Sequence, residues 1–280
     1  MAEIVATMAM AHAPGVTGWL TSAPQEEQDA ILAGYRRMGE HLRASAPDLL
    51  IGVANDHLLN LPLHDPPDFC IGTAQHWRGP AEFFLDWLQV EPYELAGNPT
   101  AARALAGTLT AEGVRLATSD ELLFDDNWSV PLRFLTPDYD VPFVPIHMNC
   151  INPPLPEPAS CYAAGLAIRK AILNDLPESM RVAFFATGGL SHEPGGKRYF
   201  QVEEKFDRWF LDLLATGDVE RILAESTIEK MESAGGGGTT ELLAWLVALG
   251  VATNKVANPV FYVPSVEMRC GIGGVVWKTA

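Results

Sequence analysis

The chain has 280 residues, a length that suits one large α/β domain and leaves two small domains as a weaker alternative. Of these residues 48% are apolar and 19% are charged, which is the composition of a folded globular protein. The formal net charge of −16 argues against nucleic acid and anionic membranes as partners, because both bind basic surfaces, but a single local arginine could still hold an anionic substrate.

The apolar runs are too short for a membrane-spanning helix. The longest of them, residues 242–252, falls well below the ~20 residues that such a helix needs. The first residues carry an acid and no base before a short apolar run, so they predict a first strand rather than a signal peptide. The cysteines are scattered without a Cys-x-x-Cys motif, which predicts reduced thiols and a cytoplasmic protein: Cys70, Cys150, Cys161 and Cys270.

The first part of the chain predicts a strand, a helix and a second strand. Residues 3–10 and 48–54 are apolar runs typical of buried strands, and residues 25–45 between them have helical spacing of apolar side chains. Each strand runs into a polar segment that contains a histidine, His12 after the first and His57 after the second. We therefore expect a βαβ unit with a histidine at the carboxyl end of each strand.

The middle of the chain is less regular. Residues 61–99 are rich in proline and aromatic residues and predict an excursion over a site, with one short strand at 69–72. Regular elements are then expected as follows: a helix at 100–112, a strand at 114–117, a helix within 120–135, a strand at 141–148, a loop at 149–158, a helix at 159–174 and a strand at 181–187.

The last part of the chain predicts mainly helices. They are expected at 201–214, in short pieces to 231, and at 239–249 after a tetraglycine loop, with a final strand at 261–263. We see no internal repeat and no clean domain boundary. The prediction is an α/β fold, residues 1–280 forming a single catalytic domain whose mostly buried central sheet is flanked by helices on both faces.

The stretch 186–196 directly follows the expected strand at 181–187. Two glycines let the backbone turn sharply there, and His192 comes just past the carboxyl end of the strand. In open α/β sheets ligands gather at that edge, and a histidine titrates near neutral pH, so His192 is a candidate acid/base. The alternative is a glycine-rich turn whose histidine caps a backbone carbonyl.

His12, His57, His192 and Glu241 recur at comparable places, three after strands and one at a helix start. Two imidazoles and one carboxylate leave positions open on a metal, which is the arrangement that non-haem Fe(II) uses in oxygenases. A fourth residue would then be free to act as an acid/base. Taken singly, each histidine is more often a structural residue held by a hydrogen bond than a ligand, and Glu241 is more often a first-turn glutamate favoured by the helix dipole.

Four short motifs lie in order along the chain: His12-Ala-Pro, Asn55-Asp-His57, Gly188-Gly-Leu-Ser-His192 and Thr240-Glu241-Leu-Leu-Ala-Trp. Together they resemble the type-III (LigB-like) extradiol ring-cleaving dioxygenases, the family of the protocatechuate 4,5-dioxygenase catalytic subunit and 2,3-dihydroxyphenylpropionate dioxygenase. The resemblance implies that His12, His57 and Glu241 bind Fe(II), with Mn(II) as an alternative, and that His192 is the catalytic acid/base.

One position departs from the family pattern. The family usually has Asp-His-Gly shortly before a Pro-Leu pair, and here that block reads Asp125-Asp126-Asn127 before Pro131-Leu132. Asp126 thus occupies the place of a second active-site histidine that contacts substrate. The substitution predicts an altered substrate or proton inventory, unless the loop is shifted or Asp126 points to solvent.

The expected activity is extradiol (meta) cleavage of a catechol-type ring by O2 in aromatic catabolism, with a small aromatic substrate as partner. Two alternatives remain: cleavage of an aminophenol or dihydroxypyridine-type substrate, motivated by Asp126, and a non-catalytic Memo-like scaffold, against which Glu241 argues. Relatives imply either a homo-oligomer or a complex with a small partner subunit. A lesser candidate for the pocket is His147, which could equally belong to the core; Trp77, Trp128 and Met268 could pack a planar ring, but such residues more often belong to the core.

Overall fold

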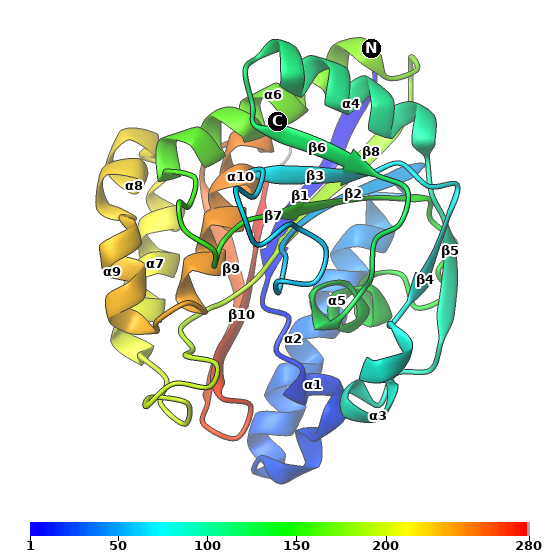
Figure 1. The fold of residues 1–280 in the computed structure, drawn as a ribbon. Helices are drawn as coiled ribbons and strands as arrows, with labels where there is room; N and C mark the ends of the chain where they lie inside the picture. The colour runs from blue at the N-terminus through cyan, green and yellow to red at the C-terminus, as the bar shows by residue number, and fades with distance from the viewer. Residues whose placement is uncertain (279–280) are drawn as a thin grey trace.

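A mixed eight-stranded sheet forms the centre of the protein (Figure 1) in the computed structural model, which describes residues 1–278. Its strand order is β6-β3-β7-β2-β8-β1-β10-β9, and the four neighbouring strands β7, β2, β8 and β1 run parallel. The strands of this sheet are β1 (Glu3–Met10), β2 (Leu49–Asn55), β3 (Phe69–Gly72), β6 (Leu116–Ser119), β7 (Phe143–Met148), β8 (Arg181–Thr187), β9 (Ala257–Ser265) and β10 (Cys270–Trp277).

Helices cover both faces of the sheet, as the sequence predicts. On one face α4, α6 and α10 pack against the parallel strands, and on the other face α2 and α5 do so (Figure 1). The helices, with their 3-10 turns, are α1 (Gly15–Gly18), η1 (Leu20–Ser22), α2 (Gln25–Ala44), η2 (Glu82–Phe84), α3 (Leu85–Leu88), α4 (Pro99–Ala111), α5 (Asp126–Leu135), α6 (Pro158–Asp175), α7 (Glu204–Thr216), α8 (Val219–Glu225), α9 (Ile228–Ala234), η3 (Thr239–Leu242) and α10 (Leu243–Val251).

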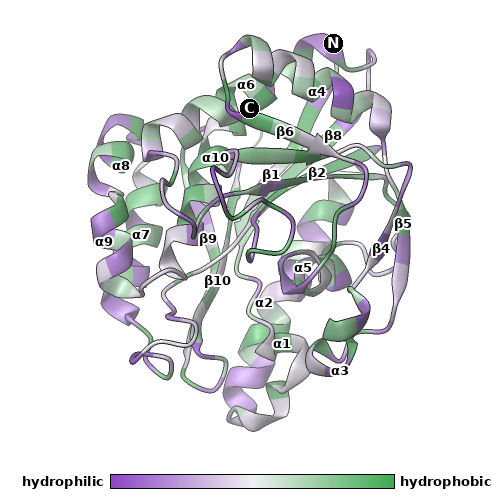
Figure 2. Ribbon diagram, viewed as in Figure 1, coloured by the Kyte–Doolittle hydropathy of each residue, from purple (hydrophilic) through white to green (hydrophobic). Residues whose placement is uncertain are grey.

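The hydrophobic core lies in two layers, one on each side of the sheet. Figure 2 shows the central strands and α10 largely in the green of hydrophobic residues, while the outer helices carry purple, hydrophilic faces. Burial on both faces explains why the parallel strands are continuous apolar runs in the sequence. None of the helices in residues 1–278 is long and apolar enough to cross a membrane.

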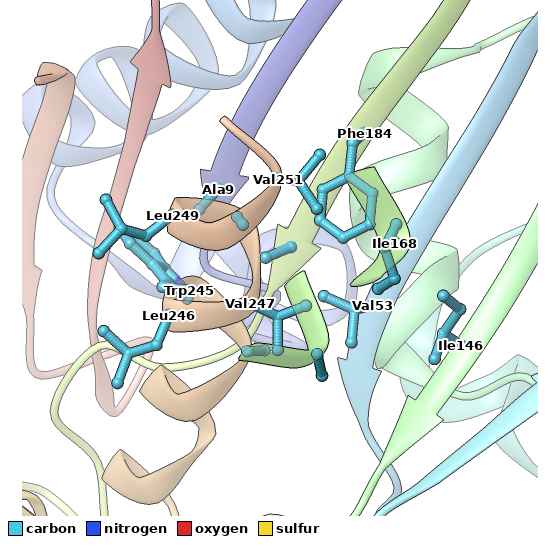
Figure 3. Packing of buried hydrophobic residues seen from close by; sticks show 14 of the residues in the cluster. Ala9, Val53, Ile146, Ile168, Phe184, Trp245, Leu246, Val247, Leu249 and Val251 are labelled. Atoms are coloured by element: carbon cyan, nitrogen blue, oxygen red, sulfur yellow. The ribbon is translucent and has the colours of Figure 1, made fainter. Parts of the chain in front are cut away.

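Helix α10 is buried along its whole length. Figure 3 shows Val247 and Val251 of this helix beside Phe184 of β8 and Val53 of β2. It also crosses α6 very closely, since a Cβ added to Gly165 would lie 2.1 Å from the carbonyl oxygen of Val247. This packing fixes the segment that precedes α10, the 3-10 turn that carries Glu241.

The structure corrects the sequence prediction at several elements. Strand β10 was not predicted, because Gly271, Gly273 and Gly274 interrupt its apolar pattern. The excursion at 61–99 contains an antiparallel hairpin of β4 (His76–Gly79) and β5 (Tyr93–Ala96) that was also missed. Helix α5 begins only at Asp126, and β6 and β9 extend beyond the strands expected at 114–117 and 261–263.

Candidate active site

The two strands of the βαβ unit bring His12 and His57 together. Each histidine follows its strand by two residues, and β8 lies between β1 and β2 in the sheet. Both side chains therefore leave the same carboxyl edge of the parallel strands, one on each side of β8, where ligand sites of α/β sheets are found. Their rings meet edge to face with centroids 5.2 Å apart.

Glu241 reaches the same point from the 3-10 turn η3 before α10. Its carboxylate is buried and lies 3.2 Å (Oε2) from Nε2 of His12 and 3.1 Å (Oε1) from Nε2 of His57. The backbone N–H of Gly189 donates a 2.8 Å hydrogen bond to it, which holds one oxygen in place. Gly188 makes this approach possible, because a Cβ there would lie 2.8 Å from the Cβ of Glu241.

Hydrogen bonds at the far nitrogens orient both imidazole rings. His57 Nδ1 lies 3.0 Å from Oδ2 of Asp125, and because a carboxylate only accepts, Nδ1 carries the hydrogen. His12 Nδ1 lies 3.1 Å from the hydroxyl of Thr187 at the end of β8. The Nε2 atoms of both rings are thereby turned toward Glu241, as in metal sites whose histidines are oriented by hydrogen bonds to their other nitrogen.

The Gly188–Ser191 turn places His192 beside this group. Its Nδ1 lies 3.0 Å from the carbonyl oxygen of Leu190, so Nδ1 donates and the Nε2 of a neutral ring is left as an acceptor. His192 lines the cavity, and its Nε2 is 3.7 Å from Oε1 of Glu241. The histidine thus caps a backbone carbonyl with one nitrogen and offers the other to the cavity.

Two consecutive carboxylates complete the group from the start of α5. Asp125 is the N-cap of that helix, since its side chain accepts a 2.8 Å bond from the N–H of Asn127, and it also holds His57. Asp126 lines the cavity with Oδ1 3.5 Å from Nδ1 of His57. No role was predicted for Asp125 from the sequence. The available signal was its position before a helix, where an aspartate is favoured as the N-cap.

The ionisable groups of the site shift one another's pKa values. Burial raises the pKa of Glu241, but the charges of His12 and His192 lower it by more, so it lies well below the usual value. Burial raises the pKa of Asp126 to about 6, with His57 lowering it and Asp125 raising it. In the described part of the chain, ligand atoms of His12, His57 and Asp126 lie within 4.8 Å of one another and could hold a metal ion.

These residues open onto a cavity of about 490 Å³, within the range of small-molecule sites of roughly 300–1,000 Å³. The rest of the cavity lining is mainly apolar and aromatic. It includes Trp19, Phe84, Trp87 and Met268, together with Arg269. The cavity therefore suits a flat, largely apolar molecule with a polar edge.

The lesser candidates for the pocket divide into core residues and one residue that lines the cavity. His147 is fully buried, accepts a 2.9 Å bond from the indole of Trp128, and is absent from the cavity wall. Trp77 is buried in the core and donates to the carbonyl of Phe143. Of these candidates only Met268 lines the cavity.

Two adjacent histidines, buried carboxylates and an apolar cavity are typical of enzymes that use a metal ion to act on a small organic substrate. Residues 6–267 match the family described as the catalytic LigB subunit of aromatic ring-opening dioxygenase, and the chain belongs to this family. The predicted resemblance and the assignment to aromatic ring-cleaving dioxygenases are both confirmed.

Two curated relatives illustrate the range of similarity. A 2,3-dihydroxyphenylpropionate/2,3-dihydroxicinnamic acid 1,2-dioxygenase of Escherichia coli is 26% identical over 322 residues, covering 96% of this chain and 97% of the relative. Gallate dioxygenase of Pseudomonas putida is 30% identical over 176 residues, which span 61% of this chain but only 51% of that enzyme. A crystal structure of an uncharacterised Escherichia coli K12 protein shares the fold, with a TM-score of 0.56, 13% identity and coverage of 87% and 92% of the two chains.

Proposed function

We propose that this protein opens the ring of a catechol-type substrate with O2, by extradiol cleavage at an Fe(II) held by His12, His57 and Glu241. The observation that carries the proposal is the Glu241 carboxylate, which lies 3.1 and 3.2 Å from the Nε2 atoms of the two histidines. Neighbouring ligands about 2.1 Å from an octahedral ion are roughly 3 Å apart, so this donor set fits a metal.

Glu241 is a better third ligand than Asp126. Asp126 faces the Nδ1 side of His57, and that nitrogen already carries the hydrogen donated to Asp125. Glu241 faces the Nε2 side, where the lone pair of the neutral ring points. Two imidazoles and one carboxylate are the usual ligands of non-haem Fe(II), which when bound supplies the redox chemistry that lets O2 attack an aromatic ring.

His192 is proposed as the acid/base. Because Nδ1 donates to Leu190, Nε2 of the neutral ring can take the proton of a substrate hydroxyl and later return it to the opening ring. The same hydrogen bond keeps the ring from rotating away during the exchange. The ring borders the cavity beside Glu241, where the substrate hydroxyls would lie.

Asp126 supports the second candidate substrate class. It stands where the family usually has a histidine, and an ionised carboxylate only accepts hydrogen bonds whereas a histidine can also donate them. A substrate with an amino group or ring N–H beside the hydroxyl would donate a hydrogen bond to Asp126, which a deprotonated second hydroxyl of a catechol could not do. We therefore keep aminophenols and dihydroxypyridines as alternatives to catechols.

Other features support the remaining parts of the proposal. The cysteines Cys70, Cys150, Cys161 and Cys270 are buried and unpaired, which agrees with a reducing, cytoplasmic compartment. The intact carboxylate at Glu241 supports a catalytic rather than a Memo-like scaffold role. Assembly as a homo-oligomer or with a small partner subunit also remains part of the proposal.

Iron content and turnover of three variants test the assignments. Anaerobically loaded Glu241→Gln should lose most of its iron, whereas Asp126→Asn, the matched removal of a neighbouring carboxylate, should retain it. His192→Ala should keep iron and lose about 10²–10⁴-fold in turnover. A panel of catechols, aminophenols and dihydroxypyridines, followed by the yellow ring-fission product, identifies the substrate class. Full iron in the Glu241 variant, or normal turnover in the His192 variant, would refute the corresponding role.

A further inference from the structure

Arg269 lies on the turn between β9 and β10 and lines the same cavity as the proposed iron ligands. Among the described residues of the cavity wall it is the one lysine or arginine, whereas Asp125, Asp126 and Glu241 are acidic. Because guanidinium keeps its charge at any physiological pH, Arg269 gives the cavity one permanently cationic point.

Aromatic rings hold the guanidinium in place. Its carbon lies 4.5 Å from the ring centre of Tyr199, 4.9 Å from that of Trp19 and 5.3 Å from that of Phe200. Nη1 also donates a hydrogen bond to the hydroxyl of Tyr199. Such contacts fix the plane of the guanidinium but leave its charge without a counter-ion.

The hydrogen-bonding capacity of Arg269 is only partly used. Its Nε is buried and has no hydrogen-bond partner within the described chain. Within residues 1–278 no carboxylate forms an ion pair with it, although six of the other twelve arginines are paired. A buried donor without a partner is costly, and a planar guanidinium suits a carboxylate.

The backbone of Arg269 adds an independent observation. Its φ is +60°, in the left-handed region where glycine or asparagine is favoured. Its N–H donates a 3.0 Å bond to the carbonyl of Val266, which closes the turn. An arginine that occupies such a position at a conformational cost indicates a use for its side chain.

We propose that Arg269 binds an anionic substituent of the aromatic substrate, a carboxylate on the ring or on a short side chain. The inference rests on the proposed ring-cleavage function and narrows its substrate class to acidic catechols. With the hydroxyl edge at Glu241 and the anion at Arg269, the ring would lie across the cavity against apolar walls such as Met268. The net charge of −16 repels anions, so a local cation is needed to bind one.

A substrate-charge comparison separates recognition from a structural role. The test measures kcat/KM for 3,4-dihydroxybenzoate and for uncharged 4-methylcatechol with wild type, Arg269→Met and Arg269→Lys. Loss of a charge-assisted contact should lower kcat/KM of the Met variant for the acid by about 10- to 100-fold. The value for 4-methylcatechol should stay within about twofold, and the Lys variant should recover part of the loss because it keeps the charge.

An equal loss on both substrates would mean that Arg269 only supports the fold, and no loss on either would also overturn the proposal. Anaerobic calorimetry of 3,4-dihydroxybenzoate binding to the iron-loaded proteins is run in parallel. If wild type cleaves neither compound, the proposed function fails, while weaker binding by Arg269→Met would still support anion recognition. If the Met variant does not fold, the Lys variant decides. A preference for the acid that persists, with weaker binding because lysine is shorter and cannot bind a carboxylate bidentately, supports the proposal. Equal affinity for the acid and the neutral compound overturns it.

Discussion

The tetraglycine loop before Glu241 offers a direct test of how His192 is positioned. A Cβ added to Gly238 would lie 2.6 Å from both Cδ2 and Nε2 of the His192 ring and 2.6 Å from its carbonyl oxygen. Gly238→Ala therefore pushes on the imidazole that we propose as the acid/base, without changing any ionisable group. We expect this variant to fold, to bind iron and to turn over slowly.

The magnitude follows from the contacts. Gly238 has φ −87° and ψ −48°, a conformation open to alanine, so the cost is steric rather than backbone strain. The methyl group and the ring must separate by about 1 Å to reach ordinary contact distance, which for such overpacking costs about 1–3 kcal/mol. The ring can yield only by weakening its 3.0 Å bond to Leu190. A displacement of ~1 Å at a reacting group costs about 100-fold in rate.

The matched control is Gly236→Ala in the same loop. A Cβ at Gly236 has no atom nearer than 3.9 Å, so this variant should keep kcat within about twofold of wild type. Initial rates of ring-fission product, iron content and melting temperature should be measured for both. If Gly238→Ala turned over at the wild-type rate with normal iron, the Nε2 of His192 would not be the proton-transfer atom.

Two further predictions concern stability. Burial raises the pKa of Asp207 to about 6, so the stability that its protonated form contributes is present at low pH and is lost as pH rises through 6. Between pH 5 and 7.5 the unfolding free energy of wild type, measured in urea, should therefore fall by about 1 kcal/mol relative to that of Asp207→Asn. The same pH dependence in both proteins would contradict this. Gly165→Ala should destabilise the protein by about 1–3 kcal/mol because the added Cβ meets the backbone of α10. Gly107→Ala, which has open space around it in α4, should instead stabilise the protein by up to about 1 kcal/mol. Similar melting temperatures for the two variants would show that α6 and α10 can separate at little cost.

The juxtaposition of the main site residues could be predicted from the sequence. His12, His57 and His192 each follow an apolar run, and the carboxyl ends of parallel strands meet at one edge of a sheet. Glu241 was grouped with them from its place at a helix start after a glycine loop, and the family resemblance then implied its role as a ligand. The structure brings all four together, while their roles remain predictions.

The parts that escaped prediction depend on long-range pairing. Strand β10 pairs antiparallel with β1, Met10 opposite Gly274, and this register folds the β9–β10 turn back over the cavity. Its glycines dilute the apolar pattern on which a strand prediction rests. The sequence pattern therefore did not place Arg269 at the cavity. Asp125 was missed for a related reason, because its bond to His57 joins residues far apart in sequence.

The charges around the cavity together define how a substrate can lie in it. Glu241 lies beside Nε2 of His57 and Asp125 beside its Nδ1, and Asp126 is a further carboxylate that lines the cavity. An acidic substituent placed beside Asp126 would meet a like charge, whereas at Arg269 it would meet the one fixed cation of the described wall. Attraction at Arg269 and repulsion at Asp126 favour the same orientation, with the acidic substituent at Arg269 and the hydroxylated edge of the ring at the proposed iron ligands.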